Sequence, residues 1–290
     1  MDIKDESLLA LQQEAWMLRE KFFPASIQFD YPEATEVISI TGTDCALNCA
    51  HCDGHYLKNM TPINKVGMTN KKYTSCLISG GCDKSGKVPI DGAWQQMAKL
   101  KTNRKMNLHV GLVSEAEAAT LPQVCDVVSF DFVADNDTIK EVYGLEKTVE
   151  DYINCFRALR KYVKVLPHIC IGLKGGEIAG EYKALEIMQE ENPDGIVFIV
   201  FNPTKNTRYA DRTPPPLEDV IKIMATARKM FPEKPIHLGC MRPKGQYRAQ
   251  LDSWAIKTGV NKIVVPTSNA QKLATELGLT IQKGQECCVL

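Results

Sequence analysis

Residues 41–56 read TGTDCALNCAHCDGHY and contain three cysteines within eight residues, Cys45, Cys49 and Cys52. They directly follow the apolar run 37–40, which is expected to form a strand. Three thiols with the spacing C-x3-C-x2-C can face one point only if the backbone wraps as a loop. Glycine and small polar residues flank the cysteines, which is typical of a ligand loop rather than of a packed core. The stretch therefore predicts a metal or cluster site at the end of a strand.

The number of ligands separates the possible metal sites. A tetrahedral zinc site uses four protein ligands, or three and a water molecule in an open catalytic site. An iron–sulfur cluster can be held by three cysteines, which leaves one iron free to bind a substrate. A zinc knuckle completed by His51 or His55 is one alternative, and three core cysteines that bind nothing are another.

Composition limits the class of protein. The chain has 290 residues, of which 44% are hydrophobic, so it can bury a substantial core, and its length fits one α/β barrel or two small domains. Lys and Arg together number 35, as do Asp and Glu, so the formal net charge is zero. We therefore expect neither nucleic acid nor a membrane surface as a partner.

The N-terminal residues MDIKDESLLALQQEAW carry acids, and they lack the basic and apolar regions of a secretory signal. No apolar run in the sequence is long enough to cross a bilayer, so we expect a cytoplasmic protein. Because the cytosol keeps thiols reduced, the eleven cysteines are not expected to form disulfides. Metal or cluster ligation accounts for them better.

The pattern of β-rich runs alternating with helix-like segments predicts βα units around a parallel sheet. The eight expected strands are 37–40, 76–79, 108–112, 127–132, 165–171, 196–201, 236–238 and 262–265. Helices are expected at 7–21, with Ser7 as the N-cap, and at 93–100, 115–119, 149–162, 180–190, 217–230, 247–258 and 269–278. Segment 22–32 is expected to cover the bottom or side of the barrel.

The predicted fold class is α/β, a TIM-like (β/α)8 barrel with functional residues at the carboxyl ends of the strands. Three domains are expected. They are an N-terminal helical extension at 1–35, the barrel at 36–278, and a cysteine-bearing C-terminal tail at 279–290 that lies over the barrel mouth.

Several polar residues follow or lie on the expected strands. Gly80 and Gly81 permit a ligand to approach the backbone closely, and Cys82 comes next, either as a buried thiol in a tight turn or as a ligand in the barrel mouth. Ser129 and Asp131 share one face of their strand, and polar groups inside a barrel are costly unless paired, so we expect them to meet a cofactor or substrate. The other inward candidates are His109, which fits a core role equally well, His168 and Cys170.

Two loops and the C-terminal residues contain the remaining candidate site residues. GGEIAGE at 175–181 opens a helix whose amides suit an anion, although a plain βα loop explains it equally well. The long loop 201–216 is expected either to shape a substrate entrance or to be a solvated loop. Cys240 lies at a strand exit, and Cys287 and Cys288 lie in the terminal ECCVL. The tail would bring these cysteines to Cys82 around a second iron–sulfur cluster, whereas CCVL alternatively matches a prenylation signal.

The cysteine loop resembles that of the radical S-adenosylmethionine (SAM) superfamily, C-x3-C-x-(aromatic)-C, with His51 at the aromatic position. The resemblance implies that Cys45, Cys49 and Cys52 ligate three irons of a 4Fe-4S cluster, whose fourth iron chelates SAM. It implies no catalytic side chain beyond the cluster ligands. The implied SAM contacts are His51, Gly80, Gly81, Ser129, Asp131, His168 and Ile178, although Cys82-Asp83 replaces the acid of the family's GGE-like motif.

Segments 39–60, 79–89, 167–181, 238–248 and 286–288 together resemble biotin-synthase-related radical SAM proteins. More narrowly, they are similar to subunits of the archaeal-type two-component lipoyl synthase. That family implies abstraction of hydrogen from an octanoyl chain and sulfur insertion from an auxiliary cluster. The candidate auxiliary ligands are Cys82, Cys240, Cys287 and Cys288, with Arg242 as a possible non-thiolate ligand.

The implied partners are an octanoylated lipoyl carrier protein or peptide, a paralogous subunit, and an electron donor such as ferredoxin or flavodoxin. Two other classes stay open. One is a radical SAM enzyme that acts on another small substrate without sulfur insertion. The other is a non-catalytic iron–sulfur or zinc protein.

Overall fold

The computed structural model describes residues 5–67 and 72–290, so residues 1–4 of the expected extension lie outside the described part. One parallel sheet of eleven strands forms the centre of the molecule, in the order β11-β1-β10-β9-β8-β7-β6-β5-β4-β2-β3. The strands are β1 (Ser26–Asp30), β2 (Thr35–Ser39), β3 (Thr61–Pro62), β4 (Ser75–Ser79), β5 (Lys105–Leu108), β6 (Val127–Asp131), β7 (Lys164–Ile171), β8 (Ile196–Val200), β9 (Ile236–Leu238), β10 (Lys262–Val264) and β11 (Thr280–Gly284).

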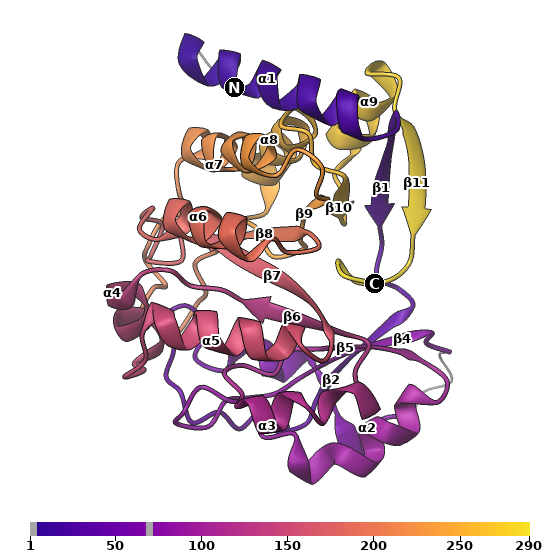
Figure 1. The fold of residues 1–290 in the computed structure, drawn as a ribbon, viewed down its shortest axis with the longest axis vertical. Coiled ribbons are helices and arrows are strands. Elements are labelled where there is room, and N and C mark those ends of the chain that lie inside the picture. The colour runs from indigo at the N-terminus through magenta and orange to yellow at the C-terminus, as the bar shows by residue number, and fades with distance from the viewer. Residues whose placement is uncertain (1–4, 68–71) are drawn as a thin grey trace.

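Helices cover the outer face of the sheet, which curls into an incomplete barrel (Figure 1). The main helices are α1 (Glu6–Phe22), α2 (Trp94–Lys101), α3 (Glu115–Ala118), α5 (Val149–Arg160), α6 (Glu181–Glu191), α7 (Leu217–Met230), α8 (Gly245–Lys257) and α9 (Ser268–Glu276). None of the helices in the described ranges is both long and apolar enough to cross a membrane. The apolar faces of sheet and helices meet in one large buried core.

Seven of the eight expected strands are confirmed, as β2, β4 and β6 to β10, and so are the expected helices. The eighth, expected at 108–112, lies too late in the chain, because β5 ends at Leu108. A closed (β/α)8 barrel is not confirmed. In the described part of the chain, the order of strands runs from β11 to β3 without closing, which leaves a gap between the two edges. The expectation that segment 22–32 only covers the barrel is wrong, because β1 lies within it and pairs with β10 and β11.

The N-cap of α1 is Asp5 rather than the expected Ser7. The carboxylate of Asp5 accepts hydrogen bonds from the amides of Ser7 and Leu8, at 2.9 and 3.2 Å. A carboxylate caps the first turn well because it accepts from free amides and carries a charge that favours the helix dipole. The N-cap therefore lies two residues earlier than the sequence pattern predicts.

The C-terminal tail lies at the end of the barrel opposite the mouth, so the expected position over the mouth is wrong. Gln285 accepts from the amide of Ala34 at 2.9 Å, and Glu286 meets Thr74 and Lys105, which lie at the amino ends of β4 and β5. Residues 287–290 then turn inward. Cys287 and Val289 pack against Val127, Leu166 and Val197, near the amino ends of β6, β7 and β8.

This tail bridges the gap between the two edges of the sheet, and Figure 1 places the C-terminus in that gap. We call residues 285–290 the floor segment. The chain direction explains its position, since β11 runs parallel to β1 and the end of β1 leads directly to the start of β2. A chain that leaves β11 therefore arrives at the amino ends of β2, β4 and β5.

Candidate functional site

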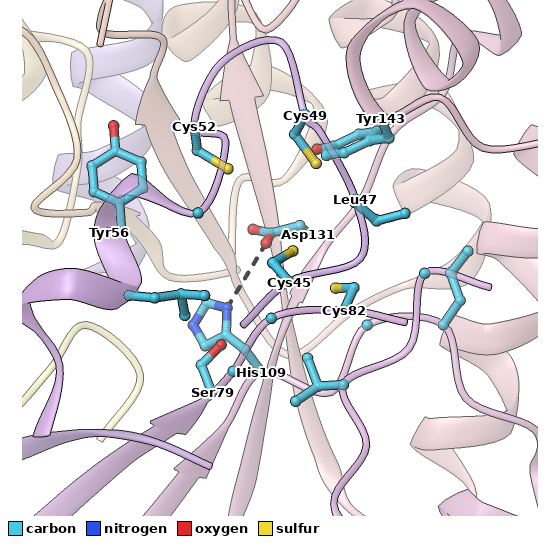
Figure 2. Close-up of a pocket in the computed structure, with 18 of the residues that line it drawn as sticks. Cys45, Leu47, Cys49, Cys52, Tyr56, Ser79, Cys82, His109, Asp131 and Tyr143 are labelled. Atoms are coloured by element: carbon cyan, nitrogen blue, oxygen red, sulfur yellow. Dashed lines mark ion pairs between the residues drawn. The ribbon is translucent and has the colours of Figure 1, made fainter. Parts of the chain in front are cut away.

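The carboxyl ends of β2, β4, β5 and β6 surround a cavity of about 270 Å³. Cys45, Cys49 and Cys52 all line it, as Figure 2 shows, together with the carboxylate of Asp131 and the imidazole of His109. The cavity wall also contains the side chains of Leu47, Val88, Leu112 and Leu145. It therefore combines a thiol-rich rim with an apolar interior and a few polar groups.

The cysteine loop turns back on itself through its own hydrogen bonds. The amides of Cys52 and Asp53 both donate to the Cys49 carbonyl, at 3.3 and 3.1 Å. Asp53 and Gly54 follow with φ of 42° and 67°, a left-handed pair that reverses the chain. This turn keeps the second and third cysteines on the cavity side.

The glycine-rich turn after β4 packs directly against the cysteine loop. A Cβ atom on Gly81 would lie 1.9 Å from the Asp44 carbonyl oxygen and 2.5 Å from the Cα of Cys45. The amide of Gly81 donates to the Thr41 hydroxyl at 2.7 Å, and the amide of Ala46 donates to the Cys82 carbonyl at 2.8 Å. Only glycine fits between the two segments, so this position fixes the first cysteine against β4.

The thiols of Cys49 and Cys52 affect each other. Their interaction raises the pKa of Cys49 and lowers the pKa of Cys52. Burial adds to the rise at Cys49. Because metal ligation requires thiolates, iron would displace the protons of the thiols that it binds.

The arrangement fits an iron–sulfur cluster better than zinc. Within the described residues, no three side chains of His, Cys, Asp or Glu are arranged around a single ion. A cluster does not require that, since each thiolate binds its own iron. Neither histidine supports the zinc alternative, because His55 is absent from the cavity wall and His51 lines it beside three thiols that do not converge.

His51 leaves a polar atom without a partner. Its Nδ1 is buried and, in the described part of the structure, accepts or donates no hydrogen bond. The ring packs edge-on against Tyr143, with 5.6 Å between the ring centroids. A buried polar atom in a cavity wall is costly unless a ligand or water meets it. His51 is therefore suited to contact a bound polar ligand.

Asp131 and His109 form a polar pair on the cavity wall. Their Oδ2 and Nδ1 atoms are 3.8 Å apart, shown by the dashed line in Figure 2. Burial alone would raise the pKa of Asp131, but the nearby imidazoles of His109, His168 and His51 outweigh it and lower that pKa. The carboxylate is thus an anion inside the barrel, with 55% of its side-chain surface open to the cavity.

The structure brings together five of the seven residues expected to contact SAM, namely His51, Gly80, Gly81, Ser129 and Asp131, all of which line this cavity. Ser129 donates its hydroxyl proton to Asn107 at 2.9 Å. The other two, His168 and Ile178, are not part of the cavity wall. The Nε2 atom of His168 faces Cys288, and Ile178 packs against the core.

The four expected auxiliary cysteines fall into two groups. Cys82 lies beside Cys45 in the first cavity (Figure 2). Cys287 and Cys288 lie in the floor segment, and Cys240 follows the carboxyl end of β9. Burial raises the pKa values of Cys287 and Cys288, and Cys240 lies close enough to raise them further. The structure therefore does not bring Cys82 to the other three.

Arg242 is fully occupied by protein partners. Its Nε donates to Asp252 at 2.7 Å, and its two terminal nitrogens donate to the carbonyls of Gly239, Val264 and Val265. Both side chains of the ion pair are 0% exposed. A guanidinium with these bonds has no free nitrogen for a cluster, which contradicts the idea of Arg242 as a ligand.

Two further features were not expected as site residues. Tyr143 lines the cavity from a π-helical turn, η5 (Ile139–Tyr143), and Tyr152 of α5 lies near it. Burial raises the pKa values of both phenols, so both stay neutral. A π-turn often occurs at functional sites, but the sequence 139–143 carries no signal of it.

The long loop 201–216 closes over the cysteine loop from the far side of the barrel. Arg208 donates to the carbonyls of Asn48 and Glu141, at 3.2 and 3.1 Å, and the amide of Tyr209 donates to the carbonyl of Ala50 at 3.0 Å. Tyr56 of the cysteine segment also meets the hydroxyl of Thr204 at 3.0 Å. The loop therefore holds the cysteine loop in place, although none of its own residues lines the cavity.

The terminal CCVL is not accessible for lipid attachment, because Cys287 and Val289 are buried. Cys287 is 7% exposed, and its thiol accepts a hydrogen bond from Asn107 at 3.3 Å. Val289 is equally buried, and the carbonyl of Leu290 accepts from the Lys262 ammonium at 3.2 Å. A prenylating enzyme would have to pull this segment out of the barrel, which argues against the prenylation alternative.

No protein-family model and no curated protein matches the chain. Among solved structures, methylornithine synthase (PylB) has a TM-score of 0.69 and 14% identity, over 97% of this chain and 91% of that one. The FeFe-hydrogenase maturase HydG from Carboxydothermus hydrogenoformans has a TM-score of 0.67 and 13% identity, over 97% and 73%. SuiB from Streptococcus suis, bound to S-adenosylmethionine, has a TM-score of 0.53 and 12% identity, over 92% and 65%. The chain thus shares its fold with these proteins, one of which was solved with S-adenosylmethionine bound.

Proposed function

We propose that this chain is a radical SAM enzyme. The observation that carries the proposal is that Cys45, Cys49 and Cys52 line one cavity at the carboxyl ends of the strands, in a fold shared with such enzymes. When bound, a 4Fe-4S cluster and SAM supply a 5′-deoxyadenosyl radical that can abstract hydrogen from an unactivated C–H bond.

The protein's own residues have distinct tasks in this proposal. The three thiolates hold the cluster, and Gly81 keeps the first of them against β4. His51 offers its unpartnered Nδ1 to SAM, and the Asp131 carboxylate, open to the cavity, accepts hydrogen bonds from a hydroxyl or ammonium group of the bound ligand. Loop 201–216 holds the cysteine loop through the contacts of Arg208 and Tyr209.

The finer proposal is sulfur insertion into an octanoyl chain on a lipoyl carrier protein or peptide, with an auxiliary cluster as the sulfur donor. Two observations support it. The apolar part of the cavity wall, which includes Leu47 and Leu112, suits an alkyl chain. Three thiols, Cys240, Cys287 and Cys288, also lie together in a second part of the barrel. A paralogous subunit and a ferredoxin or flavodoxin are the partners that this reaction would need.

A radical SAM enzyme without sulfur insertion is the second candidate. The observation that favours it is the position of Cys82, which lies with the first three cysteines and leaves the second group with three thiols. Such an enzyme would need the first cluster alone.

Iron and sulfide counts on anaerobically reconstituted protein separate the two candidates. We expect two clusters in the wild type and one in the Cys45→Ala/Cys49→Ala/Cys52→Ala variant. A matched variant, Cys76→Ala/Cys125→Ala/Cys155→Ala, removes three buried thiols outside both groups and should keep two clusters. One cluster in the wild type would exclude sulfur insertion from an auxiliary cluster, and none would exclude the radical SAM proposal.

Activity is tested by incubating the protein with SAM, a reductant and an octanoyl-lysyl peptide, with and without a paralogous partner. We expect 5′-deoxyadenosine and a peptide that has gained sulfur, both detected by mass spectrometry. 5′-Deoxyadenosine without sulfur gain would favour the second candidate.

A further inference from the structure

The floor segment brings Cys288 to a defined position inside the barrel. Its carbonyl accepts a hydrogen bond from His237 Nδ1 of β9 at 2.9 Å, and the carbonyl of Leu290 accepts from Lys262 of β10 at 3.2 Å. Lys262 is itself held by Asp30, at 2.9 Å. These contacts fix the backbone on both sides of the Cys288 thiol and aim it into the barrel interior.

The imidazole of His168 on β7 contacts the Cys288 thiol through one nitrogen. Its other nitrogen contacts a backbone carbonyl, which fixes the orientation of the ring. Its Nδ1 lies 3.1 Å from the carbonyl oxygen of Leu166, and its Nε2 lies 3.4 Å from the Cys288 sulfur. Because a carbonyl oxygen can only accept, Nδ1 must carry the hydrogen. The lone pair of the neutral ring therefore lies on Nε2 and faces Cys288.

This is the geometry in which histidines bind metals. A ligating imidazole donates its remaining N–H to a carboxylate, a backbone carbonyl or water, and that bond selects the nitrogen that binds. His168 has this backbone bond already, and it is only 4% exposed. No other polar side chain in the described residues meets its Nε2, apart from the Cys288 thiol.

Cys240 lies two residues after the end of β9. It follows His237, the residue that holds the Cys288 carbonyl, and its own carbonyl accepts from Arg248 at 2.8 Å. Unlike Cys287, whose thiol is bonded to Asn107, the Cys240 side chain is exposed. A group bound at Cys288 would thus have a second thiol three residues beyond the His237 contact.

We propose that His168 is a ligand of the auxiliary cluster, bound through Nε2, with Cys240 and Cys288 as thiolate ligands. The inference rests on the proposed function, since it requires an auxiliary cluster. In this assignment the imidazole takes the place of Cys82, which lies in the cavity of the first three cysteines. Because histidine carries no charge, a cluster with mixed ligands would have a higher reduction potential than one held by thiolates alone.

The test uses the variant Cys45→Ala/Cys49→Ala/Cys52→Ala, in which the auxiliary cluster is the only one expected. Pulsed electron paramagnetic resonance on its reduced form detects the nuclear spin of a directly bound imidazole nitrogen. Adding His168→Asn removes Nε2, while the amide nitrogen of the new side chain still donates to the Leu166 carbonyl. His237→Asn is the matched control, because that residue touches the Cys288 backbone and not its thiol.

We expect nitrogen coupling in the parent and in the His237→Asn variant, and its loss in the His168→Asn variant. A cluster without nitrogen coupling in the parent, or coupling that survives His168→Asn, overturns the assignment of His168 and leaves the two-cluster proposal standing. Absence of any cluster in the parent rejects the two-cluster proposal itself, and the assignment falls with it.

A second variant covers the case in which His168→Asn does not fold. His168→Cys offers a thiolate at the same position, so we expect it to retain the cluster, to lose the nitrogen coupling and to lower the reduction potential. Nitrogen coupling unchanged in this variant would equally overturn the assignment.

Discussion

Gly81 is the residue at which the two halves of the first site touch. A Cβ atom on this residue would point at the Asp44 carbonyl oxygen and at the Cys45 Cα. Both are backbone atoms, so they cannot rotate away. Gly80 differs, because a Cβ there would lie 3.1 Å from atoms of the Ile40 and Thr41 side chains. The requirement for glycine at 81 is therefore steric and specific to the cysteine loop.

We predict that Gly81→Ala displaces Cys45 and abolishes or strongly reduces loading of the first cluster. Overpacking of this kind costs about 1–3 kcal/mol of folding free energy as well. Iron content and the thermal unfolding midpoint measure the two effects. Gly92→Ala is the control, since a Cβ there meets nothing within 4 Å. Full cluster loading in Gly81→Ala would show that the cysteine loop can move away from β4.

Arg242 and Asp252 form the most enclosed ion pair of the described residues. The second oxygen of Asp252 accepts from the Thr267 amide at 2.8 Å, so the carboxylate is bonded on both sides. Breaking a buried pair costs far more than breaking one in water, because the remaining charge stays without a partner.

We predict that Asp252→Asn lowers the free energy of unfolding by about 3–5 kcal/mol in denaturant titrations. Glu276→Gln, which removes an exposed partner of Lys272, should change it by less than about 1 kcal/mol. If Asp252→Asn instead left stability unchanged and altered the auxiliary cluster spectrum, Arg242 would have to be reconsidered as a ligand.

Among the elements, the loop 201–216 has the clearest link to the site. A single terminal nitrogen of Arg208 joins it to carbonyls of the cysteine loop and of the π-turn. On its other side, the loop interlocks with the turn after β7, where a Cβ on Gly176 would lie 2.1 Å from the Thr213 carbonyl. The loop is therefore anchored on one side to the cysteine loop and on the other to the turn after β7.

We predict that Arg208→Ala loosens this loop and exposes the first cluster. The expected result is faster bleaching of the cluster by ferricyanide and faster proteolytic cleavage within 201–216, with the cluster still loaded. Lys205→Ala, an exposed position in the same loop, is the control. An unchanged bleaching rate would indicate that Tyr209 and Tyr56 hold the loop without Arg208.

The elements also show what the sequence could predict and what it could not. Strands β2, β4 and β6 to β10 were recognisable because buried parallel strands are short apolar runs. Strand β5 (KMNL) begins with a polar residue, and it was expected too late in the chain. Strands β1 (SIQFD) and β11 (TIQKG) contain polar residues at several positions, and their pairing with each other depends on chain segments far apart in sequence. The sheet edge that they form was therefore missed.

The site likewise combines residues that are close in sequence with residues that only the fold brings together. Cys45, Cys49 and Cys52 are close in sequence, so their spacing alone predicts that they act together. Cys82 and Cys288 are ligand candidates by residue type, but the three-dimensional path of the chain decides which cavity each one reaches. The tail direction in particular carries no local signal, and this is why the floor segment was expected at the wrong end of the barrel.

At the scale of the whole molecule, the floor segment seals an incomplete barrel. Its Cys287 and Val289 cover apolar side chains on β6, β7 and β8 that the open sheet would otherwise expose. It also joins the two edges of the sheet through Ala34, Thr74 and Lys105.

We predict that a chain ending at Gly284 loses about 2–5 kcal/mol of unfolding free energy, which is typical when buried aliphatic side chains are removed. It should bind a hydrophobic dye more strongly and load only the first cluster. Lys105→Ala, which removes one exposed contact to Glu286, should keep both clusters. Retention of both clusters in the shortened chain would show that the floor segment supplies no ligand.

The pairing of β1 has a further consequence for how the protein is made. Its partners β10 and β11 are synthesised long after it, so a nascent chain carries β1 as an unpaired edge for most of translation. Chains emerge and fold from the amino end, and contacts between distant segments form slowly. The ligands of the first cluster are thus available early, whereas the interior thiols of the tail arrive only as the barrel is sealed.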